Sequence, residues 1–265
     1  MSLRTRAAVL AIALVAPLAV TAGPAQAAPA PRPKPVAAPA SSLLVNLNNL
    51  LARILPVPPI PGAAPSLVSQ VSASTVKISG VACGYRLQGS GFSPAPDTIV
   101  TNAHVVAGTT STQVLRPDGR TLPASVVAFD PSRDLAVLHV PGLGQPSLGL
   151  GAAVPGEAGA VFGHPRGQVP IEISPARVVR KITIDLGDIY DQPTTPRQIL
   201  VLSSDLEPGD SGAPLVNSAG KVIGVAFGVA NLRRSTAFAV ASEELAPVLA
   251  QPRGGPVSTG PCLPD

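Results

Sequence analysis

The chain has 265 residues and a formal net charge of +4 at pH 7. This length fits one large all-β domain or two small ones, and 45% hydrophobic residues can bury a sizeable core. Aromatic residues make up only 3%, so small aliphatic side chains must fill that core. Two arginines belong to a segment that we expect to be removed, which leaves +4 − 2 = +2. Charge therefore gives no reason to expect a nucleic-acid partner.

Residues 1–27 have the pattern of a secretory signal peptide. Two arginines precede an apolar run from Ala7 to Val20, and residues 25–27 (Ala-Gln-Ala) form a small-x-small cleavage signal. The alternative is a membrane anchor, but 14 residues with Pro17 among them fall short of the about 20 needed to cross a bilayer. We expect a secreted or cell-envelope protein with no membrane span after cleavage.

Export also determines how the two cysteines are interpreted. In an oxidising compartment a pair such as Cys83 and Cys262 usually forms a disulfide. The alternative is two unpaired thiols. With only three histidines in the chain, a metal site is not expected, and neither is a cofactor.

Residues 28–65 are rich in Ala and Pro, which is typical of an extended linker. Within this linker, residues 42–55 have helical apolar spacing, Ser42 can cap the start, and Pro56 ends the pattern. We expect an amphipathic helix at 42–55. It packs on the domain, or it is part of a propeptide, or it contacts a membrane surface. Its single Arg53 argues against strong membrane binding.

Residues 66–265 form the main domain. After a short helix near 66–72 the pattern changes to short β-branched runs separated by turn residues, which is typical of a sandwich or barrel. The predicted strands are 75–82, 86–92, 98–102, 112–116, 122–129, 134–140, 159–163, 176–184, 199–204, 213–217, 221–229 and 236–241. The chain ends in a Gly/Pro-rich coil.

Ser211, in "EPGDSGAPLVNSAG", is a candidate nucleophile that requires a base. His104 follows a strand in "TIVTNAHVVAG", where a base can be rigid and exposed. His139 lies within a half-buried strand. It fits a surface histidine, or one with satisfied hydrogen bonds, better than a catalytic base. His164, in the loop "FGHPRG", fits turn chemistry better than catalysis.

The orienting carboxylate is sought in "FDPSRDLAVL". Asp134, at the head of a strand, is favoured over Asp130, because an acid there fixes the histidine tautomer and stabilises the imidazolium. The backbone N–H groups of Gly209 and Ser211 are expected to form the oxyanion hole. Asp210 is expected to lie buried beneath this loop as a structural anion.

The stretches "GSGF", "TNAHVVAG", "DPSRDLAVL" and "PGDSGAPLVNSAGKVIGVAFG" resemble bacterial chymotrypsin-fold serine peptidases of the trypsin-like and HtrA group. They are especially similar to the protease domain of MarP-type actinobacterial peptidases. The resemblance runs from about Thr75 to the C-terminus. It implies an all-β fold of two six-stranded antiparallel barrels with short flanking helices, and the triad His104, Asp134 and Ser211.

Further expectations follow from the resemblance. Cys83 and Cys262 resemble the family's bond that tethers the C-terminal tail. Asp205 lies six residues before the nucleophile, where trypsin-like enzymes carry the acid that selects Lys or Arg, and with Phe227 it is a tentative substrate-pocket residue. The apolar wall "VAFGVAN" fits a medium hydrophobic side chain equally well.

The sequence also departs from the family pattern. Ala213 replaces the second glycine of the Gly-Asp-Ser-Gly-Gly-Pro motif, and "GHPRG" stands where a "GYPGG"-like loop is expected. A signal peptide stands in place of the four-helix membrane region of MarP-type proteins, and we expect no PDZ domain.

We therefore expect a secreted, monomeric serine endopeptidase that acts on protein or peptide substrates through an acyl-enzyme. The alternative is a catalytically silent, trypsin-like binding module of the cell envelope. An esterase is disfavoured because the lipase nucleophile elbow leads into a helix, whereas residues 209–212 lead into a predicted strand.

Overall fold

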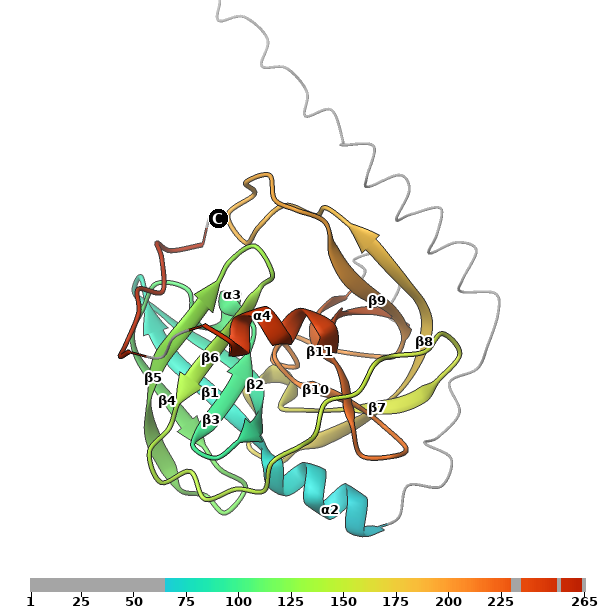
Figure 1. The fold of residues 1–265 in the computed structure, drawn as a ribbon. Coiled ribbons are helices and arrows are strands. Elements are labelled where there is room, and N and C mark those ends of the chain that lie inside the picture. Colours follow the sequence, from blue (N-terminus) through green and yellow to red (C-terminus); the bar gives the residue numbers. More distant parts are fainter. Residues whose placement is uncertain (1–64, 230–234, 252–253, 264–265) are drawn as a thin grey trace, which may run out of the picture. The chain divides into compact units, whose positions relative to one another are not determined.

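The protein is described here by a computed structural model that covers residues 65–229, 235–251 and 254–263 (Figure 1). The predicted signal peptide, the linker and the helix at 42–55 lie outside the described residues. None of the helices in the described ranges has the length and apolar character that crossing a membrane requires.

The first half of the domain is a closed antiparallel barrel of six strands. They are β1 (Thr75–Ala82), β2 (Tyr85–Ala95), β3 (Thr98–Thr101), β4 (Thr109–Leu115), β5 (Thr121–Asp130) and β6 (Leu135–His139). Their order around the barrel is β1-β2-β3-β6-β5-β4, and the pairing of β4 with β1 closes it.

The second half repeats this architecture. Its strands are β7 (Ala158–Gly163), β8 (Glu172–Ile184), β9 (Arg197–Ser203), β10 (Pro214–Asn217), β11 (Val222–Val229) and β12 (Thr236–Ala241). They close in the order β10-β11-β12-β9-β8-β7. The predicted fold of two six-stranded barrels is confirmed, and each of the twelve predicted strands overlaps one strand of the structure.

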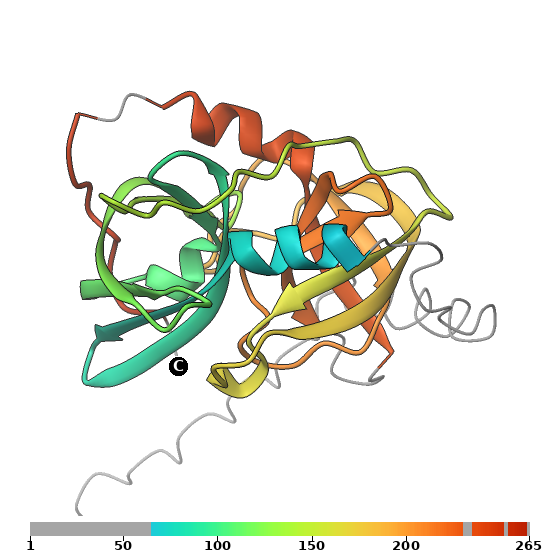
Figure 2. The ribbon, with the colours of Figure 1, turned by 90° about the horizontal axis from the view of Figure 1, so that it is seen from below.

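Short helices flank the barrels. They are α2 (Pro65–Ser74), α3 (Ala103–Val106), α4 (Leu245–Leu249) and the 3-10 turns η1 (Pro165–Gly167) and η2 (Ser242–Glu244). Helix α2, cyan in Figure 2, and helix α4 bury Val71, Leu245 and Val248 in an apolar cluster to which both barrels contribute. These two helices therefore help to hold the barrels together.

Strand β6 shows how small aliphatic residues build this core. Leu135 and Val137 face the cluster shared by the two barrels, whereas Ala136 and Leu138 face the interior of the first barrel. All four are buried. Because successive strand residues point to opposite sides, a strand buried on both faces holds the loop before it firmly. That loop carries Asp134.

Candidate active site

His104 lies in α3, one helical turn that begins two residues after β3 ends. Its neighbours Ala103, Val105 and Val106 are buried, whereas the His104 side chain is 27% exposed. The apolar residues fix the turn in the barrel and leave the imidazole facing outward. A base in this position is rigid and yet accessible to a substrate.

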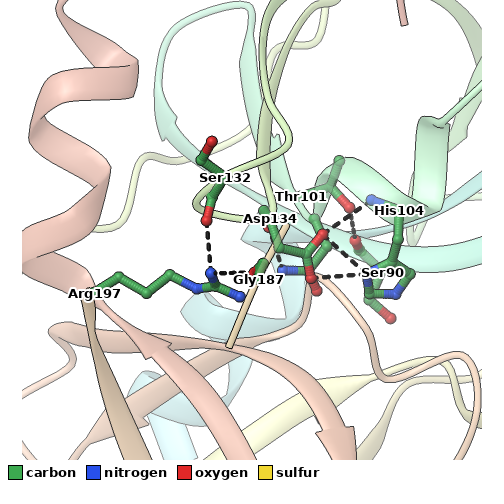
Figure 3. Close-up of polar contacts among 8 residues, drawn as sticks. Ser90, Thr101, His104, Ser132, Asp134, Gly187 and Arg197 are labelled. Carbon is green, nitrogen blue, oxygen red and sulfur yellow. Dashed lines mark hydrogen bonds and ion pairs between the residues drawn. The ribbon is translucent and has the colours of Figure 1, made fainter. Parts of the chain in front are cut away.

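Asp134 ends the loop between β5 and β6 and has the left-handed φ of 54°, which Asp tolerates better than most residues. Its carboxylate oxygens lie 2.8 and 3.0 Å from Nδ1 of His104, and Oδ1 also accepts the His104 backbone N–H at 3.0 Å (Figure 3). Because a carboxylate only accepts, Nδ1 carries the proton. Nε2 is thereby left to act as the base.

Two opposing effects set the pKa of His104. Burial lowers the pKa of the imidazole, but the charge of Asp134 and its hydrogen bond raise it. The net result is a pKa above the ordinary value of 6.5. Asp134 thus makes His104 a stronger base than an isolated imidazole in the same surroundings.

The loop that carries Asp134 is supported from both barrels. The side-chain amide of Asn102 donates to the Asp134 carbonyl at 2.8 Å. From the second barrel, the buried Arg197 donates through Nη1 to the carbonyls of Ser132 at 2.6 Å and Gly187 at 2.9 Å (Figure 3). Arg197 on β9 therefore ties the loop before Asp134 to the other barrel.

Asp130, the alternative acid, has a different role. Its carboxylate accepts the side chain of Arg133 at 2.9 Å and the Arg133 backbone N–H at 2.9 Å. Arg133 also donates to Glu244 at 3.1 Å. Asp130 therefore belongs to an ion-pair network that braces the loop, away from the imidazole.

Ser211 is held between the two barrels. Its carbonyl accepts the N–H of Ser90 on β2 at 2.8 Å, and the next residue, Gly212, donates to the carbonyl of Ala226 on β11 at 2.8 Å. Gly212 has a φ of 86°, and a Cβ there would lie 2.1 Å from the Ser90 carbonyl oxygen. Only glycine fits at that position. Among the described residues, no hydrogen bond joins Oγ of Ser211 to Nε2 of His104.

The turn before Ser211 leaves two backbone N–H groups unpaired among the described residues. The carbonyl of Pro208 accepts the N–H of Arg166 at 2.5 Å. In a trans peptide C=O and N–H point in opposite directions, so the Gly209 N–H points away from Arg166. Within the described parts of the chain, the N–H groups of Gly209 and Ser211 have no acceptor. Both are available for an external oxyanion.

Ser90 joins this turn to the first barrel. Its hydroxyl donates to the Gly209 carbonyl at 2.8 Å and accepts the N–H of His164 at 2.9 Å. The Ser90 carbonyl accepts the hydroxyl of Thr101 at 2.7 Å. Neither Ser90 nor Arg197 is singled out by the sequence analysis. For Ser90 a signal was present, since it is the polar residue of "GSGF" between two glycines in a predicted strand.

Asp210 is buried as expected, and Oδ2 accepts the N–H of Glu207 at 2.9 Å. Its charge state differs from the prediction. Burial and the nearby charge of Glu172 raise the pKa of Asp210 to about 7, although Arg166 lowers it. Asp210 is therefore a buried structural carboxyl as predicted, but near neutral pH it is an anion only in part.

The other two histidines lie apart from the triad. His139 is exposed at the end of β6, with Nδ1 3.2 Å from the Asp97 carbonyl. His164 is buried next to η1, with Nδ1 3.1 Å from the Gln168 carbonyl. Burial lowers the pKa of His164. Each has the surface or turn role that the sequence suggested.

A cavity of about 220 Å³ opens beside Ser211. Its apolar walls come from Leu206, Ala226, Phe227 and Val229. Asp205 is exposed and does not line this cavity. Of the two tentative pocket residues, the structure brings only Phe227 to the nucleophile.

Cys83, in the β1–β2 hairpin, is bonded to Cys262 in the C-terminal tail, with their Cα atoms 6.2 Å apart. The tail has further anchors, because Gly108 N–H donates to the Thr259 carbonyl at 3.0 Å and Val257 N–H to the Val126 carbonyl at 2.8 Å. The tail is thus held against the first barrel close to α3.

Comparison with known proteins agrees with this geometry. The model of the trypsin-like peptidase domain matches residues 89–225, a range that contains all three candidate triad residues. Serine protease Rv3671c of Mycobacterium tuberculosis is 38% identical over 239 residues, which is 84% of this chain and 59% of that protein. A probable periplasmic DegP-like serine endoprotease of Chlamydia pneumoniae is 33% identical over 52% of this chain and 28% of its own length.

Solved structures show the same relationship. The crystal structure of the M. tuberculosis Rv3671c protease in its active form has a TM-score of 0.72 and 37% identity, covering 80% of this chain and 97% of that one. The present chain spans about three fifths of the full length of that curated relative. The matching domain model, the relatives and the two-barrel fold together establish that the chain belongs to the trypsin-like peptidase family.

Proposed function

We propose that the protein is an extracytoplasmic serine endopeptidase in which His104, Asp134 and Ser211 form the catalytic triad. The observation that carries this proposal is the pair of contacts, 2.8 and 3.0 Å, between the Asp134 carboxylate and Nδ1 of His104. This pairing leaves Nε2 of the partly exposed imidazole available to a substrate. The signal peptide predicted from the sequence of residues 1–27 supports export.

The reaction follows from these roles. Neutral His104 takes the proton of the Ser211 hydroxyl as Oγ attacks the scissile carbonyl carbon. The N–H groups of Gly209 and Ser211 stabilise the oxyanion that develops, and each such donor typically lowers the barrier by about 3 to 4 kcal/mol. His104 then protonates the leaving amine. A water molecule, activated in the same way, hydrolyses the acyl-enzyme.

The primary pocket is proposed to take a medium-sized apolar side chain. The cavity beside Ser211 has the apolar walls Leu206, Ala226, Phe227 and Val229. Two carboxylates also line it. Glu207 is already paired with Arg166, and Asp210 accepts the Glu207 backbone N–H and has a pKa that burial raises to about 7. Asp205 is exposed and does not line the cavity. A buried ammonium or guanidinium without an available partner would be costly, so this cavity favours an aliphatic residue over Lys or Arg.

Active-site labelling tests the proposal. A fluorophosphonate should label the wild-type protein, and Ser211→Ala should fold normally, remain unlabelled and lose nearly all cleavage of a mixed peptide library. Ser218→Ala, in the exposed hairpin turn after β10, is the matched control and should be labelled like the wild type. Absence of labelling in the wild type would instead favour a silent binding module.

The same library tests the pocket. Cleavage should occur after Val, Leu or Ala in preference to Lys or Arg. A strong preference for basic residues would contradict the assignment of the apolar cavity while leaving the triad intact.

A further inference from the structure

A second groove, with a volume of about 510 Å³, lies in the first barrel. Its walls come from the β1–β2 hairpin (Ala82, Cys83, Tyr85 and Leu87), from the residue after α3 (Ala107) and from the C-terminal tail (Cys262 and Leu263). None of these side chains carries a charge. The groove is more than twice as large as the cavity beside Ser211 and lies within the usual volume range of ligand pockets.

Strand β2 connects the groove lining to a residue beside Ser211. Alternate residues of a strand share one face, so Tyr85, Leu87 and Gly89 lie in a row. A Cβ on Gly89 would lie 2.7 Å from the side chain of Val105, the residue after His104, and 3.0 Å from the carbonyl oxygen of Ser211. At about 3.4 Å per residue, Leu87 lies about 7 Å from Gly89 along the strand. The row therefore leads from the nucleophile into the groove.

The helical turn α3, which carries His104, leads directly into the groove lining. Ala107, which lines it, follows His104 by three residues, and the next residue, Gly108, donates to Thr259 of the tail. His104 must protonate the amine that leaves when the peptide is cleaved. The half of the substrate that begins with this amine thus starts at His104, on the side of the first barrel. The cavity at Leu206 and Phe227, on the second barrel, receives the other half.

We propose that this groove binds an apolar side chain from the first or second residue after the cleaved bond, and that the disulfide-linked tail forms one of its walls. The inference rests on the proposed endopeptidase function. An extended substrate advances about 3.3 to 3.6 Å per residue, so its second residue past the bond reaches Leu87. The uncharged lining disfavours Asp or Glu at that position, because their charge would lose water without gaining a partner.

Acyl transfer isolates this subsite from the rest of the reaction. The enzyme is acylated with an ester of the preferred apolar residue. Amino-acid or dipeptide amides, which attack through their free amino group, then compete with water for the acyl-enzyme. The acceptor nitrogen attacks the acyl carbon, the new N–C bond forms, the bond to Ser211 Oγ breaks, and His104 passes the amine proton to Oγ. The ratio of aminolysis to hydrolysis reports acceptor binding alone.

The acceptors are Leu-amide, Asp-amide, Gly-Leu-amide and Gly-Asp-amide, which separate the first position from the second. In the wild type, the ratio of aminolysis to hydrolysis should be about tenfold or more higher with the leucine acceptor than with the aspartate acceptor at one of the two positions. Leu87→Ser and Leu263→Asp should each reduce this preference at least threefold. Val81→Ser is the control, since Val81 is 47% exposed in the same hairpin but does not line the groove.

The outcomes separate the two proposals. If Ser211 is not acylated, the proposed function itself fails. If acylation occurs but wild-type enzyme accepts leucine and aspartate amides equally, the groove is not an apolar subsite. If the leucine preference persists in both folded variants, as judged by circular dichroism, the selectivity resides elsewhere and the inference is overturned.

Discussion

The hydroxyl of Ser90, in the first barrel, donates a hydrogen bond of 2.8 Å to the carbonyl of Gly209, in the second half of the domain. The same hydroxyl accepts the N–H of His164 at 2.9 Å. This side chain therefore ties the turn that is proposed to supply the oxyanion hole to the first barrel. Its position makes it a positioning residue for catalysis.

Ser90→Ala should lower kcat by about tenfold with little change in KM. The substitution leaves the Gly209 carbonyl and the His164 N–H without their partner, at a cost of about 1 to 3 kcal/mol for each unsatisfied group. Steady-state kinetics on a peptide substrate measures the effect. Ser93→Ala is the matched control, because Ser93 is a buried serine of the same strand whose hydroxyl, within the described parts of the chain, bonds only the nearby Ala95 carbonyl. Equal kcat in both variants would remove Ser90 from the site.

The rate should decline on acidification with a midpoint above pH 6.5. Only neutral His104 can accept the Ser211 proton, and Asp134 raises the pKa of His104. The protonated, inactive form therefore persists to higher pH than for an unperturbed imidazole. A pH profile of kcat/KM measures the midpoint.

Asp134→Asn should move that midpoint below 6.5 and reduce the rate by about 10⁴-fold. The substitution removes both influences that raise the pKa of His104, whereas burial, which lowers it, remains. Asp130→Asn is the comparison, since Asp130 bonds Arg133 and not the imidazole. A midpoint that stays in place in Asp134→Asn would contradict the pairing.

Asp210 should make the protein less stable as the pH rises from about 4 to 7. Its pKa is about 7 in the folded protein against an ordinary 3.8. Between these values the unfolded chain binds fewer protons than the folded one, so the free energy of unfolding falls with rising pH. Asp210→Asn removes this dependence. From pH 4 to pH 8 the variant should gain roughly 2 to 4 kcal/mol relative to the wild type in urea unfolding. If the free energy of unfolding of the wild type and of Asp210→Asn changed in parallel with pH, the pKa of Asp210 would not be raised in the folded protein.

Arg197→Met should reduce both stability and kcat. It removes the hydrogen bonds to the Ser132 and Gly187 carbonyls, each worth about 1.5 to 3 kcal/mol for a charged donor, and it loosens the loop that carries Asp134. Melting temperature and kcat are measured together. Arg180→Met, at an exposed position of the neighbouring β8, should alter neither by a comparable amount.

The fold was largely predictable from local patterns, whereas the supports of the site were not. Strands β1 to β12 have β-branched runs bounded by turn residues, and these patterns depend only on neighbours in the sequence. Contacts such as Ser90 with Gly209, or Arg197 with Ser132, join residues far apart in the chain and follow from how the two barrels meet. The charge state of Asp210 was missed for the same reason, because burial is a property of the assembled domain.

The failure of Asp205 as a pocket residue has a related cause. Its spacing from Ser211 matched the trypsin-like pattern, but in this chain the turn at residues 204–210 directs Asp205 to solvent and Leu206 to the cavity. A shift of one residue along an extended segment reverses which side chain points inward. Spacing alone could not determine that register.

The bond between Cys83 and Cys262 should stabilise the domain and shape the groove on the first barrel. It closes a sequence separation of 179 residues, for which the chain-entropy model gives about 4 to 5 kcal/mol, although measured values are often smaller. Cys262→Ser should lower the melting temperature by roughly 5 to 15 °C and keep most of the β-structure. The contacts of Thr259 and Val257 with the first barrel remain available in that variant.

Non-reduced peptide mapping of the exported protein should recover one peptide pair that joins the two cysteines. In Cys262→Ser, or after reduction, the preference for leucine over aspartate acceptors should fall while fluorophosphonate labelling of Ser211 continues, because the tail wall loosens but the triad does not depend on it. Cys83→Ser should behave identically, since either substitution breaks the same bond. Free thiols at both positions in the exported protein would show that the bond does not form. An unchanged melting point and acceptor preference after reduction would show that it has neither role.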